Sequence, residues 1–179
     1  LREKGSLANL IVMSATPIPR SLALTIYGDL DVSIIDELPA GRMPIKTKWI
    51  KDEAERQKMY NFIAKKIKEG RQVYVVSPLI EESETLNVKS AQETFEEYSR
   101  IFPDRRIGLI HGKQNYKEKQ EVMSKFKKHE LDILVSTTVI EVGVNVPNAS
   151  IMVIRDAQRF GLSSLHQLRG RVGRGQYQS

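Results

Sequence analysis

Short apolar runs alternate along the chain with segments in which apolar residues recur every three or four positions. The runs are typical of strands buried on both faces, and the spaced residues are typical of amphipathic helices. The predicted strands are 10–14, 32–35, 45–50, 72–77, 106–110, 131–136 and 151–154. Strands that alternate with helices indicate βαβ units, so we expect an α/β fold with a parallel sheet flanked by helices.

Several of the predicted helices carry recognisable signals at their ends. Asn115 and Glu118 have the spacing of a capping box, in which each side chain bonds the backbone of the other residue. Gly70 is suited to stop a helix because it tolerates the left-handed conformation. The expected helices are one after Pro19, one from Asp52 to Gly70, one over 91–101, one opening at Asn115, and one from Ser163 or Ser164.

A connector separates a short first part of the chain from the rest. Residues 38–44 contain two prolines and one glycine, a composition that favours irregular structure. We therefore place a domain boundary here, with residues 1–41 on one side and 42–179 on the other. The first part is too small to bury a core of its own. The chain begins at Leu1 and shows no signal-peptide pattern, so we expect it to be a piece of a longer protein.

Length, composition and charge limit the kinds of protein that this chain can be. The 179 residues suit one domain of ordinary size, 40% of them are apolar, and no apolar run approaches the roughly 20 residues of a membrane span. The chain has no cysteine, and its three histidines lie far apart, so we expect no metal held by protein side chains alone. This suits a cytoplasmic protein. The net charge of +6 favours polyanions such as nucleic acid, but is equally compatible with an ordinary solvated surface.

The strongest chemical signal is the run QLRGRVGR at residues 167–174. Arg171 and Arg174 are three residues apart, so on a helix or helical turn they share a face. Gly170 and Gly173 remove side chains beside them and allow a close approach. Two guanidinium groups aimed at one point suit the γ-phosphate of a nucleotide. The alternative is a basic helix end favoured by the helix dipole, and the two interrupting glycines count against it.

A second signal follows the predicted strand 131–136. Thr137 and Thr138 stand at its carboxyl end, where hydroxyl and backbone N–H groups can bind the phosphates of a nucleic acid. Gly143 and Asn145 follow in a turn that could meet a ribose. A strand followed by an ordinary polar turn is the commoner outcome for such a sequence, so this segment alone does not decide between the two.

Two weaker signals also follow predicted strands. Ser14, Ala15 and Thr16 could relay a hydrogen-bond change between two sites, although Ser or Thr before Pro is also an ordinary helix start. His111 and Gly112 could lie against a phosphate backbone, although a lone histidine at a strand end is more often structural.

Two apparent motifs fail on inspection. Residues 108–114 mimic a phosphate-binding loop, but only three residues separate the glycines and Gln stands where Ser or Thr is needed. Residues 52–55 mimic an acidic magnesium motif but follow no continuous apolar strand, so they suit the acidic first turn of a helix. A nucleotide could therefore be sensed by this chain but not fully held.

The order of the four signals is more specific than any one of them, and it resembles motifs III to VI of superfamily 2 helicases over essentially the whole chain. Residues 27–39, 78–84 and 159–162 are similar to the RecG family of bacterial ATP-dependent DNA helicases, which remodel stalled forks and recombination junctions. Residues 14–24 are shared with the transcription-repair coupling translocase, against which 34–39 argues. A non-catalytic nucleic-acid-binding or docking domain is the alternative from another class.

The resemblance implies a domain arrangement. Residues 42–179 would form the second RecA-like lobe, and 1–41 would be the tail of the first lobe with a linker. The partners would be branched or duplex DNA, together with the remainder of the first lobe and an N-terminal wedge domain. ATP with Mg²⁺ would be the cofactor, with the phosphate loop and the magnesium-binding carboxylates in that first lobe.

The resemblance also implies roles for residues. Arg171 and Arg174 would contact the ATP phosphates, and Gly143, Asn145 and Gln167 would belong to the nucleotide site. The DNA backbone would be bound by His111, Gly112, Thr137 and Thr138. Hydrolysis would be coupled to movement through Ser14, Ala15 and Thr16. The family usually has Asp where this chain has Asn145, so we expect an altered nucleotide affinity without loss of function.

Overall fold

The computed structural model describes residues 33, 43–78, 84–137, 146–173, 175 and 177–179. The predicted strand 10–14 and the helix after Pro19 lie outside the described residues, as does 32–35 apart from Ser33. The chain divides into two units, Leu1–Glu37 and Leu38–Ser179, and all described residues other than Ser33 belong to the second.

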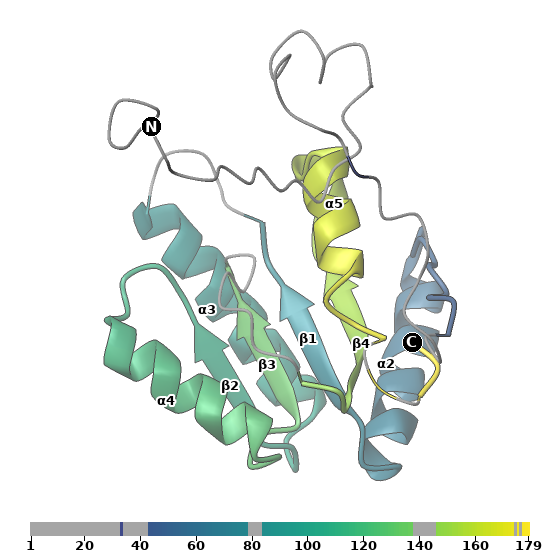
Figure 1. The fold of residues 1–179 in the computed structure, drawn as a ribbon, viewed down its shortest axis with the longest axis horizontal. Helices are drawn as coiled ribbons and strands as arrows, with labels where there is room; N and C mark the ends of the chain where they lie inside the picture. Colours follow the sequence, from purple (N-terminus) through teal and green to yellow (C-terminus); the bar gives the residue numbers. More distant parts are fainter. Residues whose placement is uncertain (1–32, 34–42, 79–83, 138–145, 174, 176) are drawn as a thin grey trace, which may run out of the picture. The chain divides into compact units, whose positions relative to one another are not determined.

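Four parallel strands form a single sheet in the described part (Figure 1). They are β1 (Gln72–Val76), β2 (Ile107–Ile110), β3 (Ile133–Ser136) and β4 (Ala149–Ile154). Their order in the sheet is β2-β3-β1-β4. Ile133 of β3 pairs with Val73 on one side and Ile107 on the other. The α/β fold with a parallel sheet is thereby confirmed.

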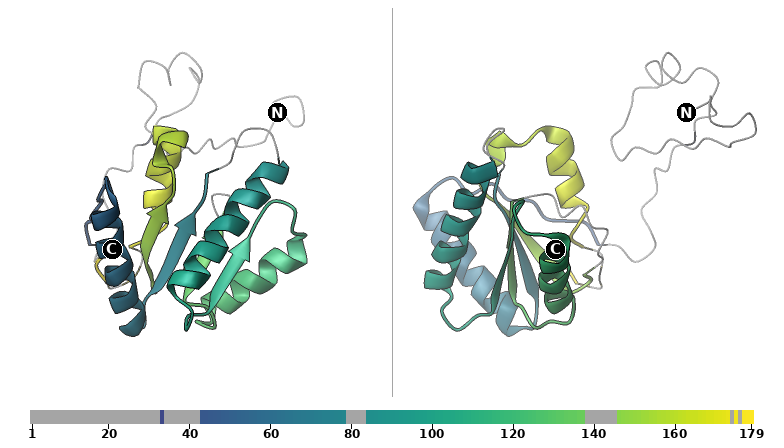
Figure 2. Two further views of the ribbon diagram at one scale, coloured as in Figure 1. Left: turned by 180° about the vertical axis from the view of Figure 1, so that it is seen from behind. Right: turned by 90° about the vertical axis from the view of Figure 1, so that its left-hand side faces the viewer.

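Helices connect the strands and lie on both faces of the sheet (Figure 2). They are α2 (Glu53–Lys68), α3 (Glu84–Ile101), α4 (Tyr116–Lys127) and α5 (Leu162–Arg169), with a short 3-10 helix η2 (Ala157–Arg159) before α5. The predicted capping box is present: Asn115 Oδ1 accepts from the Glu118 N–H (3.0 Å), and Glu118 accepts from the Asn115 N–H (2.8 Å). Gly70, with φ of +79°, follows the end of α2 as predicted.

Helix α3 starts seven residues before the predicted start at residue 91. Its inward stripe in the first turns consists of Asn87, Ala91 and Thr94, which are all buried. Because this stripe is polar or small, the hydrophobic periodicity that reveals a helix is absent there. The register of the stripe is nevertheless helical, and it continues to the fully buried Tyr98.

The predicted strand 45–50 is wrong. Residues 43–51 have no regular secondary structure, and the Lys46 N–H donates to the Ser179 carbonyl oxygen (2.8 Å). The alternation that suggested a strand does not bury one face: Ile45 is half-buried, but Trp49 is 76% exposed. Without a common buried face, nothing fixes the segment as a strand.

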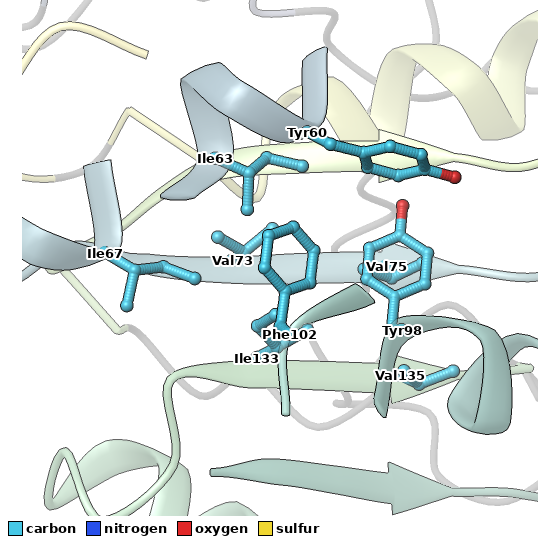
Figure 3. Packing of buried hydrophobic residues seen from close by; sticks show 9 residues of the cluster. All are labelled: Tyr60, Ile63, Ile67, Val73, Val75, Tyr98, Phe102, Ile133 and Val135. Atoms are coloured by element: carbon cyan, nitrogen blue, oxygen red, sulfur yellow. The ribbon is translucent and has the colours of Figure 1, made fainter. Parts of the chain in front are cut away.

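The two faces of the sheet carry two separate cores. Alternate residues of a strand point to opposite faces, so Val73 and Val75 of β1 serve one core and Tyr74 serves the other. The first core lies under α2 and α3 (Figure 3) and consists of Tyr60, Ile63, Ile67, Val73, Val75, Tyr98, Phe102, Ile133 and Val135. The second lies under α4 and consists of Tyr74, Ile110, Met123, Phe126, Leu134, Val146, Ala149 and Val172.

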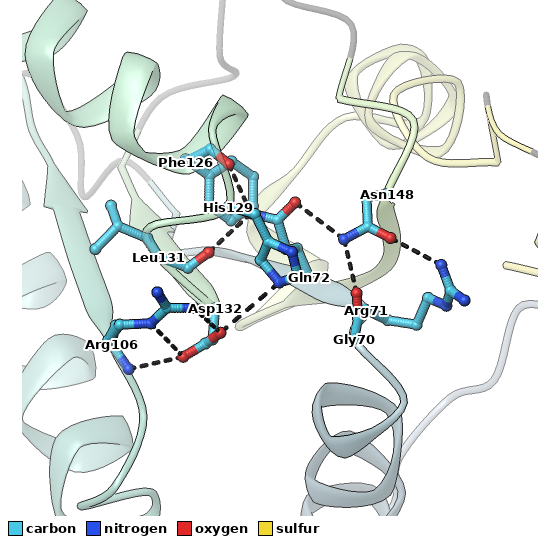
Figure 4. A network of polar contacts seen from close by, with 9 residues as sticks. All are labelled: Gly70, Arg71, Gln72, Arg106, Phe126, His129, Leu131, Asp132 and Asn148. Carbon is cyan, nitrogen blue, oxygen red and sulfur yellow. Dashed lines mark hydrogen bonds and ion pairs between the residues drawn. The ribbon is translucent and has the colours of Figure 1, made fainter.

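A buried glutamine ties together the amino ends of three strands (Figure 4). Gln72, only 1% exposed, donates through Nε2 to the carbonyl oxygens of Phe126 (2.6 Å) and Leu131 (2.8 Å). Asn148 donates to Gln72 Oε1 (3.3 Å) and to the Gly70 carbonyl oxygen (2.7 Å). The network therefore fixes the end of α4 and the residues that lead into β3 and β4 against the start of β1.

A second network joins α2, α3 and the end of β4. Glu97 accepts hydrogen bonds from Arg155 Nη1 (2.6 Å) and from the Tyr60 hydroxyl (2.7 Å). Burial acts to raise the pKa of Glu97, but the bonds from Arg155 and then Tyr60 outweigh it and hold the pKa below its ordinary value. Burial and the bond to Glu97 raise the pKa of Tyr60 to about 12, so its hydroxyl stays a donor.

We expect the substitution Gln72→Leu to lower the free energy of unfolding by about 1–3 kcal/mol, because it removes the amide that serves two buried carbonyl groups. Urea denaturation of the chain measures this loss. The matched control is Gln92→Leu on the exposed side of α3, where Gln92 donates to the exposed Glu96 (3.2 Å) and a change within about 0.5 kcal/mol is expected. Equal losses in the two variants would contradict the role given to Gln72.

We expect Arg155→Gln to raise the pKa of Glu97, because the variant lacks the cation that stabilises the carboxylate. Tyr60→Phe should raise it less. A carboxyl-detected NMR titration measures both shifts. Since the folded pKa is lowered, Glu97 stabilises the fold above its ordinary pKa of 4.5 and loses that contribution as the pH falls through the folded value. The acid-dependent loss of stability should therefore be smaller in Arg155→Gln, and an unchanged Glu97 pKa would refute this account.

Candidate nucleotide and nucleic-acid site

The carboxyl ends of β2 and β3 bring two of the predicted site residues together. His111 directly follows β2 and Thr137 directly follows β3, and these strands are neighbours in the sheet (Figure 1). The Thr137 N–H donates to the Ile110 carbonyl oxygen (3.2 Å), which precedes His111. Gly112, the next residue, is exposed, and a Cβ there would meet nothing within 4 Å. Backbone at Gly112 is thus open to close approach by a ligand.

Two buried polar atoms at this edge have no hydrogen-bond partner in the described part of the chain. They are Thr137 Oγ1 and His111 Nδ1. Thr137 is 1% exposed, so its hydroxyl is held in place by the packing around it. Because buried polar atoms are nearly always paired in native proteins, an unpaired hydroxyl and an unpaired ring nitrogen on neighbouring strand ends are unusual.

The loop after β2 is held in shape by Gln114. Its Oε1 accepts from the His111 N–H (3.1 Å), and its Nε2 donates to the Leu109 carbonyl oxygen (3.1 Å). Sequence reasoning noticed Gln114 only as a mismatch to a phosphate loop and missed this role. No sequence signal marks it, because both partners are backbone atoms that any residue would supply.

The electrostatics of this loop are mixed. Burial, together with Lys119 and Lys113, lowers the pKa of His111 below 6.5, so the ring is neutral at neutral pH. Lys119 Nζ donates to the Gly112 carbonyl oxygen (3.2 Å). A hollow of about 500 Å³ lies beside the loop, lined by His111, Lys113, Gln114, Glu118, Glu121 and Val122. Cationic character here comes from the lysines and not from the histidine.

The arginine-bearing segment begins in the last helix and continues into a turn. Helix α5 ends at Arg169, and Arg171 lies beyond it in a turn in which its N–H donates to the Leu168 carbonyl oxygen (2.9 Å). Gly173 has φ of +71°, a left-handed conformation that ends the helical path. Arg174 lies outside the described residues, so the shared face expected for Arg171 and Arg174 on a helix or helical turn stays a prediction.

The turn holds Arg171 without engaging its side chain. Leu168 and Val172, on either side, are buried, whereas Arg171 is half-buried. Within the described ranges, the Arg171 guanidinium makes no hydrogen bond or ion pair. A cation that is partly shielded from water and has no anionic partner suits an anionic ligand. Gln167 lies one turn earlier, on the exposed side of α5.

The two parts of the predicted site are not side by side on one strand edge. Figure 1 shows the chain after α5 passing down beside β4 toward α2, away from the tips of β2 and β3. Its neighbours are Ile45 and Pro147, the latter just before β4 begins. The remaining predicted residues fall outside the described residues: Ser14, Ala15, Thr16, Thr138, Gly143 and Asn145.

In the described part of the chain, no group of three or more histidine, aspartate or glutamate side chains is placed to hold a metal ion. No helix in that part is both long enough and apolar enough to cross a membrane.

Comparison with known proteins gives a consistent assignment. Residues 54–176 match the helicase conserved C-terminal domain. The chain is 60% identical over 96% of its length to the ATP-dependent DNA helicase RecG of Aquifex aeolicus, of which it covers 21%. It is 57% and 54% identical over its whole length to the proteins of that name from Streptococcus pneumoniae and Bacillus subtilis, covering 27% and 26% of them. The chain thus spans about a quarter of the length of these relatives.

The expected resemblance to the RecG family is confirmed along the whole chain, and the matched domain agrees with the parallel sheet and with the run at residues 167–174. The chain belongs to the family of helicase conserved C-terminal domains.

Proposed function

We propose that this chain is the second motor lobe of an ATP-dependent DNA helicase that remodels stalled replication forks and recombination junctions. Residues 42–179 would form that lobe, and residues 1–41 the tail of the first lobe and the linker. The observation that carries the proposal is Arg171, a half-buried residue in the turn after α5 whose guanidinium has no partner in the described part. The relatives named ATP-dependent DNA helicase RecG support the same assignment.

In this proposal the lobe completes a nucleotide site that another lobe begins. Bound ATP with Mg²⁺ supplies the phosphoryl group for transfer. Arg171, with Arg174, contacts the phosphates and stabilises the charge that develops on them. Gly143, Asn145 and Gln167 surround the rest of the nucleotide. The described residues fit ATP as sensors only: they present a free cation but no cluster of acidic ligands for magnesium.

DNA is the proposed second ligand. Thr137 and the open backbone at Gly112 lie at the carboxyl edge of the sheet, where hydroxyl and backbone N–H groups would donate hydrogen bonds to a phosphate backbone. His111 and Thr138 complete this contact, and branched or duplex DNA is the expected substrate. The net charge of +6 favours the association. Ser14, Ala15 and Thr16 couple hydrolysis to movement, and the protein acts in the cytoplasm.

In the full-length helicase, we expect Arg171→Ala to lower DNA-stimulated ATP turnover by about 10³-fold, because arginine fingers contribute on the order of 10³–10⁵ in rate. DNA binding should persist, since Arg171 is not assigned to the DNA contact. Steady-state ATPase assays at saturating DNA, with fluorescence anisotropy for DNA binding, measure the two effects. Arg100→Ala, in the last turn of α3, is the matched control and should keep normal turnover. Unaffected turnover in Arg171→Ala would sink the motor assignment and favour a non-catalytic DNA-binding domain.

The 179-residue chain by itself is expected to fold and to hydrolyse no ATP above background, with or without duplex DNA. It carries the arginines that sense phosphate but no phosphate-binding loop. A coupled ATPase assay, beside circular dichroism to confirm folding, checks this. Sustained turnover by the chain alone would refute the division of the nucleotide site between two lobes.

A further inference from the structure

The arginine-bearing turn is held by a residue far away in the sequence. Arg169, two residues before Arg171, donates through Nη2 to the Ile45 carbonyl oxygen (3.3 Å). Gly173, two residues after Arg171, lies against the Ile45 side chain: a Cβ at this glycine would be 3.1 Å from Ile45 Cγ1. Both flanks of Arg171 therefore contact one residue, on its main chain and on its side chain.

Ile45 is also packed against the core cluster that contains Val172, the residue next to Arg171. It lies on the second core, in which Val172 and Val146 are both only 4% exposed. The turn thus has a buried side chain at Val172, and Ile45 packs against the same cluster. Arg171 therefore lies between two residues that contact Ile45 and directly before a buried one.

The segment around Ile45 is itself secured by the chain after the turn. The Lys46 N–H donates to the Ser179 carbonyl oxygen (2.8 Å), and Gln178 Nε2 donates to the Pro44 carbonyl oxygen. The Arg71 guanidinium stacks on the Tyr177 ring, with its Cζ 3.1 Å from the ring centroid. Residues 44–46 therefore contact Arg169, Gly173, Gln178 and Ser179, although more than 120 residues separate Ile45 from Arg169.

From these contacts we infer that Ile45 is a positioning residue for Arg171: it sets the backbone of the arginine-bearing turn and thereby the reach of its guanidinium to the nucleotide phosphates. Ile45 itself touches no reacting group. Because residues 38–44 form the connector ahead of it, the same contact ties the connector's end to the phosphate-sensing turn. The inference about reach rests on the proposed function, whereas the inference about the backbone rests on the contacts alone.

The backbone part is tested in the 179-residue chain by ¹⁵N relaxation. In Ile45→Ala, the order parameters of the Arg171 and Val172 amides should fall from about 0.85, the value of a rigid backbone, toward about 0.6. The matched control is Ile67→Ala, which removes the same atoms from the first core. It should leave both amides unchanged. Unchanged order parameters in Ile45→Ala overturn the inference, whatever the activity of the protein.

The catalytic part is tested in the full-length helicase. Ile45→Ala should lower kcat for DNA-stimulated ATP hydrolysis by about tenfold to a hundredfold, with KM for ATP and DNA affinity unchanged, since misplacing a catalytic group by about 1 Å has effects of this size. Ile45→Val should restore most of the rate, and Ile67→Ala should keep a normal kcat at temperatures where it is folded. An equal fall in kcat in Ile45→Ala and Ile67→Ala overturns the inference.

A milder variant keeps the test informative if Ile45→Ala is poorly folded. Arg169→Met removes the hydrogen bond to Ile45 without changing the core, and should give a smaller fall in kcat and a partial fall in the Arg171 order parameter. If neither kcat nor the Arg171 order parameter changes in Arg169→Met, the inference is overturned. The outcomes also separate from the proposed function: normal turnover in Arg171→Ala would refute the motor role, while the relaxation result would still decide whether Ile45 fixes the turn.

Discussion

The structure depends on the burial of β1 along its whole length. All five residues from Gln72 to Val76 are buried, with β3 hydrogen-bonded on one side and β4 on the other. A parallel strand in this position needs crossover connections, and these place helices over both faces of the sheet. Alternate residues of β1 therefore supply two cores. The polar Gln72 at the start of β1 donates to two backbone carbonyl oxygens that would lose this donor if the glutamine were absent.

Where burial follows a simple period, the sequence predicts the fold well. The strands before His111 and Thr137 are short and mainly apolar, and in the structure their carboxyl ends meet because β2 and β3 are parallel neighbours. The same reasoning fails where the buried stripe is not apolar. The start of α3 is hidden because Asn87 and Thr94 occupy inward positions. It also fails at residues 45–50, where apolar and polar residues alternate but the apolar side chains do not share a buried face.

The candidate site shows a similar division. The residue types and their order identified the family, and the adjacency of His111 and Thr137 followed from the topology. The position of Arg171 in a turn after α5 could not be predicted, because a spacing of three residues does not show where a helix ends. Gly170 stands at the end of α5, and Gly173 takes a conformation that most residues avoid. Gln114 and Ile45 were missed for another reason: their partners include backbone atoms or a glycine, which leave no mark on the sequence pattern.

The glycines of this turn have two roles: they leave room for neighbouring atoms, and they allow the backbone conformation of the turn. Gly173 lies against the Ile45 side chain, and a Cβ on Gly175 would collide with the Pro147 carbonyl oxygen. Glycine solves the steric problem but costs conformational entropy, so a turn containing three of them would be loose if left to itself. The compensation comes from outside the turn, through buried Val172, the Ile45 contacts and the bond from Lys46 to Ser179. The backbone position of Arg171 is therefore set by the segments packed around the turn more than by the turn's own sequence.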